Sequence, residues 1–180
     1  MTKLLDGDIP TACPERDRVI LEMLYGSGLR VQEMANINLV DFDEEGLVVR
    51  GKGMKERKVP VGGAARRAME AWLPVRKKLL AETGQKTDAL VFGVSNHQSE
   101  RLTTRSIGRM VKAVAIAKGL PGYHPHQLRH AFATHLLDHG ASLQLISRLL
   151  GEAKLSTAQI YTRVSVGRMM EVYKRAHPHA

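Results

Sequence analysis

One pair of strand-like runs interrupts a chain in which most other segments have apolar residues at helical spacing. Residues 47–50 (LVVR) and 58–61 (KVPV) flank the basic, glycine-interrupted turn GKGMKER. Two such runs joined by a short glycine-containing turn predict a β-hairpin. The remaining segments show helical spacing, so we expect a mainly α domain with a small antiparallel β-hairpin or sheet, which is an α+β fold.

Apolar residues at three- and four-residue intervals predict amphipathic helices over most of the chain. The first runs from Arg16 to Tyr25 and ends at GSG (26–28), because glycine tolerates the left-handed backbone of a helix C-terminus. A second, short helix follows, with Val31 facing inward. Further helices are expected at 64–82, from Thr103 or Thr104 to Gly119, through the histidine-rich segment, at 143–150 and at 165–176.

Three local signals add detail to this pattern. Pro74 is expected to kink the helix at 64–82 or to split it, since proline lacks the amide hydrogen that an inner turn needs. ALVFG (89–93) predicts a short strand. STAQ (156–159) has the spacing of a capping box, with a serine at the N-cap and a glutamine three residues later.

Size, charge and cysteine content limit the possible classes of protein. A chain of 180 residues suits one domain. Lys and Arg outnumber Asp and Glu by 27 to 18, and the net charge of +9 favours nucleic acid over an anionic membrane as partner. Cys13 is the only cysteine, so an internal disulfide is excluded. The sequence lacks a signal-peptide pattern and an apolar run long enough to span a bilayer, so we expect a cytoplasmic protein with no membrane partner.

Five of the eight histidines lie in residues 124–139, HPHQLRHAFATHLLDH. A metal ion could use His126 with His130, or His135 with His139. The segment has no HExxH glutamate and no cysteine, and Arg129 would repel a cation. We therefore expect neither a metal nor another cofactor.

Two other roles remain for these histidines. His135 and His139 suit capping or other satisfied polar positions. His126 and Arg129 share one face of the expected helix. A group that titrates near neutral pH beside a planar fork of N–H donors suits a site that handles phosphate, so we assign His126 an acid/base role.

Four motifs carry a resemblance to a known family: GSGLRVQE, GKGMKERKVP, HPHQLRHAFATHLL and LSTAQIYTRV. In this order and at these separations they closely resemble the tyrosine recombinase (integrase) family, and within it the Xer-like bacterial recombinases. The resemblance covers roughly residues 16–175. GLR or GKG alone occurs widely by chance, whereas four motifs in register are a specific signal. The resemblance implies the catalytic-domain architecture of that family.

The resemblance implies a catalytic set of Arg30, Lys52, His126, Arg129, Glu152 and Tyr161. Tyr161 would attack the scissile phosphate and leave a 3′-phosphotyrosine with a free 5′-hydroxyl. Arg30 and Arg129 would donate to the non-bridging oxygens, where negative charge builds in the transition state.

The proton transfers and the DNA contacts are assigned by the same resemblance. A phenol has a pKa near 10, so the nucleophile needs a base, for which His126 is the candidate. Lys52, in the hairpin turn, would protonate the leaving 5′-oxygen. Lys52, Lys55 and Arg57 are expected to contact the DNA.

Position 152 departs from the family pattern. Relatives ordinarily have a histidine, sometimes a tryptophan, in LLGH, whereas this chain reads LLGE. A carboxylate there would repel the phosphate. We expect Glu152 to turn away and pair with Lys154 or Arg148, or to become protonated, and in either case to weaken the activity.

The implied organisation is a linker stub at 1–15, a catalytic domain at 16–164 and a C-terminal tail helix at 165–180 for contacts between protomers. The implied function is a site-specific recombinase that acts on double-stranded DNA in DNA integration or in dimer resolution for chromosome partition. It would work as a homo- or hetero-tetramer on DNA. Two alternatives stay open: a catalytically attenuated DNA-binding member of the fold, and a nicking-resealing enzyme of the type IB topoisomerase kind.

Overall fold

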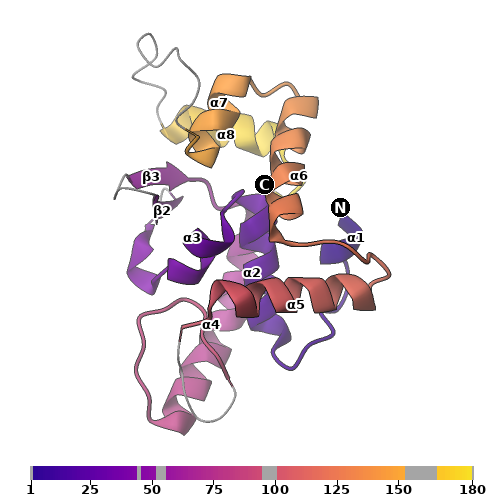
Figure 1. Cartoon of the computed structure of the whole chain (residues 1–180). Coiled ribbons are helices and arrows are strands. Elements are labelled where there is room, and N and C mark those ends of the chain that lie inside the picture. Colours follow the sequence, from indigo (N-terminus) through magenta and orange to yellow (C-terminus); the bar gives the residue numbers. More distant parts are fainter. Residues whose placement is uncertain (1, 44–45, 52–55, 95–100, 153–165, 180) are drawn as a thin grey trace.

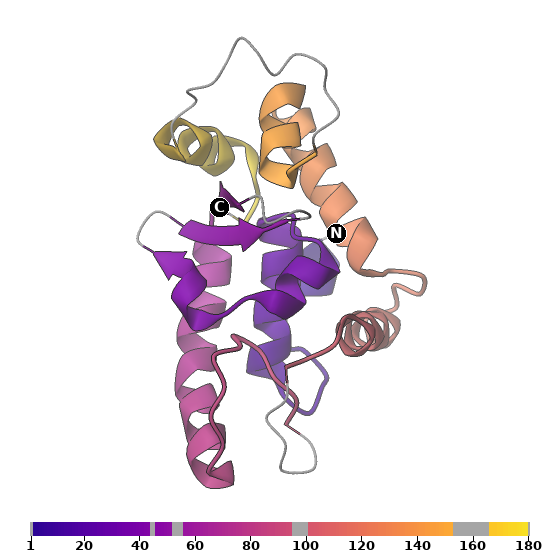
Figure 2. The same cartoon turned by 60° about the vertical axis from the view of Figure 1, so that its left-hand side comes forward.

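The computed structural model describes residues 2–43, 46–51, 56–94, 101–152 and 166–179. Helix α2 (Pro14–Gly26) lies at the centre, and α4 (Gly63–Thr83), α5 (Thr104–Ala117) and α6 (Pro125–Asp138) pack around it (Figure 1 and Figure 2). Every residue of α2 from Val19 to Gly26 is buried, because the helix is enclosed on several sides. No described helix is long and apolar enough to cross a membrane.

The helix ends follow the local sequence. Proline occupies the first turn of α2, where its missing amide hydrogen costs nothing. The predicted N-cap of α5 is confirmed, since the hydroxyl of Thr103 accepts a hydrogen bond from the Ser106 amide. Helix α7 (Leu143–Leu150) begins with the same contact from Ser142 and ends at Gly151, which has a φ of 64°.

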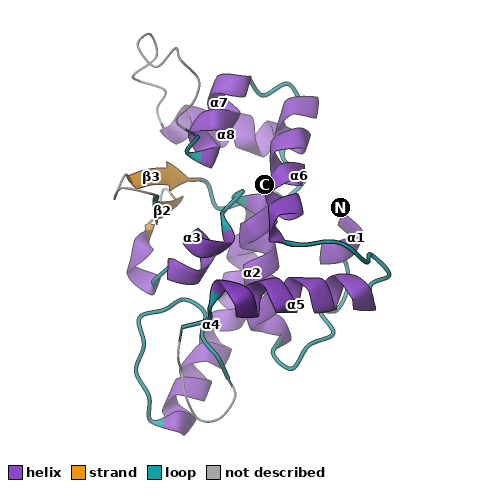
Figure 3. Cartoon of the chain, in the orientation of Figure 1, coloured by secondary structure: helices purple, strands orange, loops and turns teal. Residues whose placement is uncertain are grey.

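The predicted hairpin is confirmed and extends into a three-stranded antiparallel sheet. Strand β2 (Gly46–Arg50) pairs with β3 (Glu56–Val59) in a register that sets Leu47 opposite Val59 and Val49 opposite Arg57. Strand β1 (Phe42–Asp43) adds a two-residue edge that the sequence pattern did not predict. Helix α3 (Val31–Asn36) and a 3₁₀ turn (Leu39–Asp41) precede it, and the strands lie at one side of the helical molecule (Figure 3).

The structure excludes a split of the helix at Pro74 and a full strand at residues 89–93. Pro74 does not split its helix, because α4 continues through it to Thr83. Residues 89–93 form only isolated bridges, at Ala89 and Phe92. Their backbone carbonyls are instead occupied by side chains: Trp72 donates to the carbonyl of Leu90, and Arg76 to that of Ala89.

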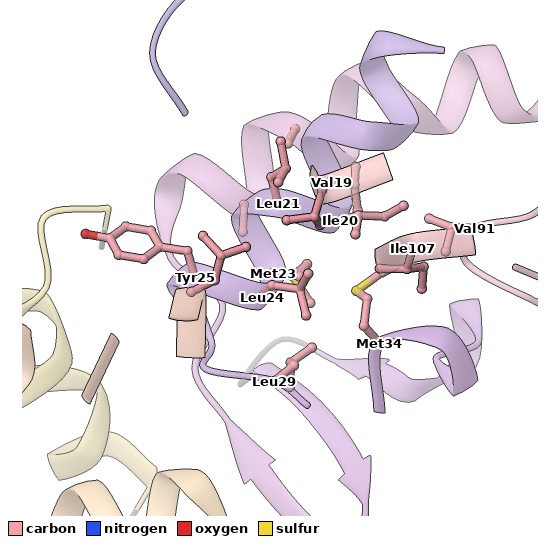
Figure 4. Packing of buried hydrophobic residues seen from close by; sticks show 14 of the residues in the cluster. Val19, Ile20, Leu21, Met23, Leu24, Tyr25, Leu29, Met34, Val91 and Ile107 are labelled. Atoms are coloured by element: carbon pink, nitrogen blue, oxygen red, sulfur yellow. The ribbon is translucent and has the colours of Figure 1, made fainter. Parts of the chain in front are cut away.

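The core has two parts. The main cluster surrounds α2, and Figure 4 shows Met34 beside Ile107 with Tyr25 at the far end. The segment expected to be a linker contributes to it through α1 (Thr2–Leu5), whose Leu4 and Leu5 are buried. A smaller cluster joins α6, α7 and α8 (Val166–Ala176) and contains Phe132, Leu136 and Tyr173.

Candidate functional site

A tight turn brings the first predicted arginine to the start of α3. Arg30 is the N-cap residue of that helix. Two residues earlier, Gly28 has a φ of 60°, and a Cβ there would lie 2.4 Å from the ring of Phe132 on α6. Only glycine combines this backbone with so close an approach. The turn therefore brings the backbone at Gly28, two residues before Arg30, against α6, which carries Arg129.

Glu33, on α3, is buried and binds two arginines. Its carboxylate accepts hydrogen bonds from the amide and Nη1 of Arg30, at 2.8 and 3.0 Å. It also accepts from Nη1 and Nη2 of Arg57, both at 2.8 Å. Nη1 of Arg129 lies 3.9 Å from the same carboxylate. Burial alone raises the pKa of Glu33, but the hydrogen bonds from Arg57 and Arg30 outweigh it and hold this pKa below its ordinary value.

Arg129 is held by two backbone carbonyls from separate parts of the chain. Its Nη1 donates to the carbonyl of Gly28 at 2.6 Å, and its Nη2 donates to the carbonyl of Leu150 at 2.7 Å. Only 7% of its side chain is exposed. Burial lowers the pKa of Arg129, and the nearby positive charge of Arg30 lowers it further. Two guanidinium groups therefore converge at one place, and Arg129 is fixed there by the backbone.

The end of α7 provides acceptors for this site. The last carbonyls of an α-helix have no partner within the helix and carry partial negative charge. Those of Leu149 and Leu150 are taken by Arg57 and Arg129. The amide of Glu152 donates back to the carbonyl of Ser147, and this bond closes the helix after Gly151.

Glu152 turns toward the site. Its Oε1 accepts from Nη2 of Arg129 at 3.2 Å, and just over half of its side chain is exposed. Arg129 was not among its expected partners, which were Arg148, Lys154 (outside the described residues) or a proton. The carboxylate thus accepts from Arg129, whose guanidinium is expected, from the family resemblance, to bind the phosphate.

His126 is exposed in the first turn of α6, while Arg129 on the next turn is buried. The rings of His126 and His124 stack with their centroids 6.4 Å apart. The structure therefore leaves the imidazole of His126 open to a ligand. Lys52, Lys55 and Tyr161 lie outside the described residues, as does the capping box at 156–159.

His135 and His139 have the structural roles expected of them. Nδ1 of His135 lies 2.7 Å from the hydroxyl of Tyr25. His139 caps α6, with its Nδ1 2.7 Å from the carbonyl of His135. The described residues contain no group of three or more His, Cys, Asp or Glu side chains that could hold a metal ion.

The tail helix packs on its own domain. Tyr173 and Ala176 of α8 are buried in the smaller core cluster. His177 is buried against Tyr25 and Phe132. His179 continues this docking, because its Nδ1 lies 2.8 Å from a carboxylate oxygen of Glu22 on α2.

Sequence reasoning missed Glu33 and the partly buried position of Arg57. The three-residue spacing of Arg30 and Glu33 in GLRVQE could have indicated the first. Arg57 stands two residues before the buried Val59, so strand alternation puts both on the inward face. Only 13% of the Arg57 side chain is exposed, and its expected contact with DNA stays a prediction.

Sequence reasoning also missed a row of exposed basic residues on α5. Arg105, Arg109 and Lys112 are exposed on α5 at intervals of four and three residues, which align them along one face of the helix. The apolar stripe predicted for this helix (Ile107, Val111 and Val114) is buried on another face. The same periodicity would have identified both faces.

The arrangement suits the binding of an anion. Three arginines (Arg30, Arg57 and Arg129) surround two carboxylates (Glu33 and Glu152), which leaves one net positive charge. The side chain of Arg30 is 44% exposed, so part of its guanidinium is open to solvent. Planar guanidinium groups bind phosphate through paired N–H donors.

The chain is similar in sequence to bacterial tyrosine recombinases. It is 46% identical over 176 residues to tyrosine recombinase XerC of Myxococcus xanthus, with 96% of this chain and 58% of that protein covered. It is 44% identical over 181 residues to tyrosine recombinase XerC of Pseudomonas aeruginosa, with 99% and 57% covered. The chain therefore spans less than two thirds of the length of these relatives.

Solved structures with a similar fold are also Xer recombinases. The structure of XerA recombinase aligns with a TM-score of 0.72 at 28% identity, covering 99% of this chain and 63% of that one. XerH site-specific recombinase, bound to its difH substrate before cleavage, aligns with a TM-score of 0.71 at 26% identity, covering 94% and 50%. The sequence matches the phage integrase family over residues 1–168. This chain belongs to the phage integrase family, and its fold is that of a tyrosine recombinase catalytic domain.

Proposed function

We propose that this chain is the catalytic part of a site-specific DNA recombinase that cuts and rejoins DNA through a 3′-phosphotyrosine at Tyr161. The observation that carries the proposal is the convergence of Arg30 and Arg129 beside Glu33. Two guanidinium groups at one place can neutralise a phosphate whose charge increases in the transition state. The XerC relatives and the DNA-bound XerH structure support a DNA substrate.

In the proposed reaction the phenolic oxygen of Tyr161 attacks phosphorus and the bond from phosphorus to the 5′-oxygen breaks. The phenol proton passes to His126, which is exposed and free to approach a ligand. Lys52 gives a proton to the leaving 5′-oxygen. Arg30 and Arg129 donate to the two non-bridging oxygens. A 5′-hydroxyl from a second strand then attacks the phosphotyrosine, and the same steps run in reverse.

Basic residues outside the site would hold the duplex. Lys52 and Lys55, which lie between β2 and β3 in the sequence, are proposed DNA contacts. The exposed row of Arg105, Arg109 and Lys112 on α5 is proposed as a second contact surface. Lysines and arginines that neutralise phosphates release bound counterions, so affinity falls as salt rises. The net charge of +9 supports this mode of binding.

Assembly and organisation are further parts of the proposal. Residues 16–164 would form the catalytic domain, and 165–180 would join protomers in a homo- or hetero-tetramer on DNA. In the single chain, Tyr173 of α8 packs on its own α6 cluster, so tetramer formation would require this helix to exchange partners. Action on chromosomal DNA would place the protein in the cytoplasm.

One observation favours the second candidate, an attenuated DNA-binding member of the fold. The ion pair between Glu152 and Arg129 occupies a donor that the reaction needs. Incubation of the chain with a nicked suicide substrate, followed by a denaturing gel, separates the two functions. A covalent protein–DNA band supports the recombinase. Binding of the same DNA without any such band would support the attenuated member.

A further inference from the structure

We propose that Arg57 is a positioning residue, which couples the β-hairpin to the arginine pair of the site. This inference rests on the proposed function. It differs from the expectation that Arg57 contacts DNA through the hairpin turn.

Three donors of Arg57 are directed at protein groups. Nη1 and Nη2 donate to the two oxygens of Glu33, both at 2.8 Å, which is the paired geometry that fixes a guanidinium in its plane. Nε donates to the carbonyl of Leu149 at 2.9 Å. With 13% of the side chain exposed, Arg57 is enclosed at the inner face of the sheet, unlike a residue at a hairpin tip.

Glu33 carries the effect of Arg57 to the arginine pair. The same carboxylate accepts from the amide and Nη1 of Arg30, so Arg57 and Arg30 hold it from two sides. Without Arg57, a buried carboxylate would lose two charged donors. The cations left near Glu33 are Arg30 and, at 3.9 Å, Arg129. Glu33 would then draw the half-exposed Arg30 toward itself and away from a phosphate, while Arg129 stays held by the carbonyls of Gly28 and Leu150.

The contact at α7 extends the coupling to a third part of the site. Arg57 takes the carbonyl of Leu149, and Arg129 takes the carbonyl of Leu150. A Cβ on Gly151 would lie 3.0 Å from Cδ of Arg57, so the two residues pack closely. The chain runs from here to Glu152 and onward in sequence to Tyr161. Arg57, on β3, therefore contacts both α3, which Arg30 caps, and the end of α7.

A positioning role and a DNA contact predict different measurements. A phosphate contact that is lost weakens DNA binding uniformly and reduces the slope of log affinity against log salt by about one. A lost positioning contact slows cleavage by DNA-bound protein, because small displacements of catalytic groups cost about 10²-fold in rate. Affinity and its salt slope then stay close to those of the native chain.

The test uses the full chain with Arg57→Met, Arg57→Lys, Glu33→Gln and the double variant Arg57→Met/Glu33→Gln. Rates of covalent adduct formation at saturating suicide substrate are compared with DNA affinity at several salt concentrations. Arg57→Met should cleave about 10–100-fold more slowly with an unchanged salt slope. Arg57→Lys should cleave faster than Arg57→Met but more slowly than the native chain. Its ammonium can reach Glu33 but cannot also donate to the carbonyl of Leu149. The matched control is Arg50→Met on β2, whose half-exposed side chain pairs with Asp41 and Glu56, and it should cleave like the native chain.

The double variant keeps the test valid if Arg57→Met folds poorly. It removes the uncompensated buried charge, so it should fold, and it should still cleave slowly because Arg30 has lost the carboxylate that anchors it. If Arg57→Met cleaves at the native rate, or if it only weakens binding with a reduced salt slope, the positioning role is wrong and the proposed function stands. A native chain that forms no adduct overturns the proposed function instead, and that result needs no variant.

Discussion

Nη2 of Arg129 donates to Oε1 of Glu152 across 3.2 Å, so a carboxylate neutralises the more buried of the two arginines proposed to bind phosphate. Arg129 is 7% exposed and Glu152 is 55% exposed. The glutamate can therefore move away when an anion arrives, whereas the arginine stays in place. This pair gives a physical reason why position 152 should limit the rate of cleavage.

Replacing Glu152 should speed the formation of the covalent adduct. Glu152→Gln removes the competing charge, and an ion pair whose carboxylate is more than half exposed is worth about 0.2–1 kcal/mol, so a gain of up to about fivefold is expected. Glu152→His should gain more, since imidazole can also donate to a phosphate oxygen. Single-turnover rates on a suicide substrate at neutral pH measure both. If neither variant is faster, Glu152 does not face the phosphate in the DNA complex.

Arg30→Ala and Arg129→Ala should both lose activity but should differ in stability. Loss of one transition-state donor typically costs about 2.7–4 kcal/mol in the activation barrier. Arg30 is half-exposed, and Glu33 keeps its bonds to Arg57, so the free energy of unfolding should change by less than about 1 kcal/mol. Arg129→Ala leaves the buried carbonyls of Gly28 and Leu150 without donors and should cost about 3 kcal/mol or more.

The free energies of unfolding of the two variants in urea, measured together with their rates of adduct formation, test this difference in stability. Equal stability losses would show that Arg129 is not anchored by the backbone as described here.

Stability should fall in acid because His177 is buried in neutral form. Burial lowers the pKa of His177 to about 3, and the neighbouring His179, His135 and His139 add to the effect. Tyr25, Phe132 and Tyr173 line the site, and Glu22 faces His179. The folded-state pKa lies below the unfolded value of about 6.5, so this contribution is complete above pH 6.5. As pH falls from 6.5 toward 3, the free energy of unfolding decreases by up to about 1.4 kcal/mol per pH unit.

The control for this loss is His177→Phe, which keeps an aromatic ring and removes the titration. The free energy of unfolding, measured between pH 7 and 5, should fall more steeply for the native chain than for the variant. Parallel slopes would show that the tail is not docked through a neutral His177.

Gly28→Ala should be much more destabilising than Gly84→Ala. Both glycines have a positive φ, 60° and 66°, and so share the backbone cost of adding a side chain. At Gly28 the new Cβ would lie 2.4 Å from Phe132, whereas nothing lies within 4 Å at Gly84. We expect on the order of 2–4 kcal/mol for Gly28 and about 1 kcal/mol for Gly84. Similar losses in thermal or urea unfolding would contradict the close approach of α6 to the turn.

The elements that the sequence predicted correctly are those with strong local determinants. Thr103, Ser142 and the glycines after α2 and α7 set helix ends through contacts a few residues away. The hairpin follows from β-branched runs around a glycine turn. Residues 89–93 were misassigned because distant side chains, from Trp72 and Arg76, take the carbonyls that a strand partner would use. The burial of Leu4 likewise depends on tertiary packing alone.

The site was predictable in its chemistry but not in its internal pairing. The motifs indicated Arg30 and Arg129, and the structure brings both to Glu33. The contact of Arg129 with Glu152, and that of Arg57 with Leu149, join residues 23 and 92 positions apart, which no local pattern encodes.

The most direct test of the account compares the native chain with Tyr161→Phe on one nicked suicide substrate. The substitution removes a single oxygen, so DNA affinity should stay nearly unchanged while the nucleophile is lost. We expect a covalent adduct for the native chain, with the DNA mapped to Tyr161 by peptide mass spectrometry, and no adduct for the variant. An adduct that persists in Tyr161→Phe, or that maps to another residue, would contradict it.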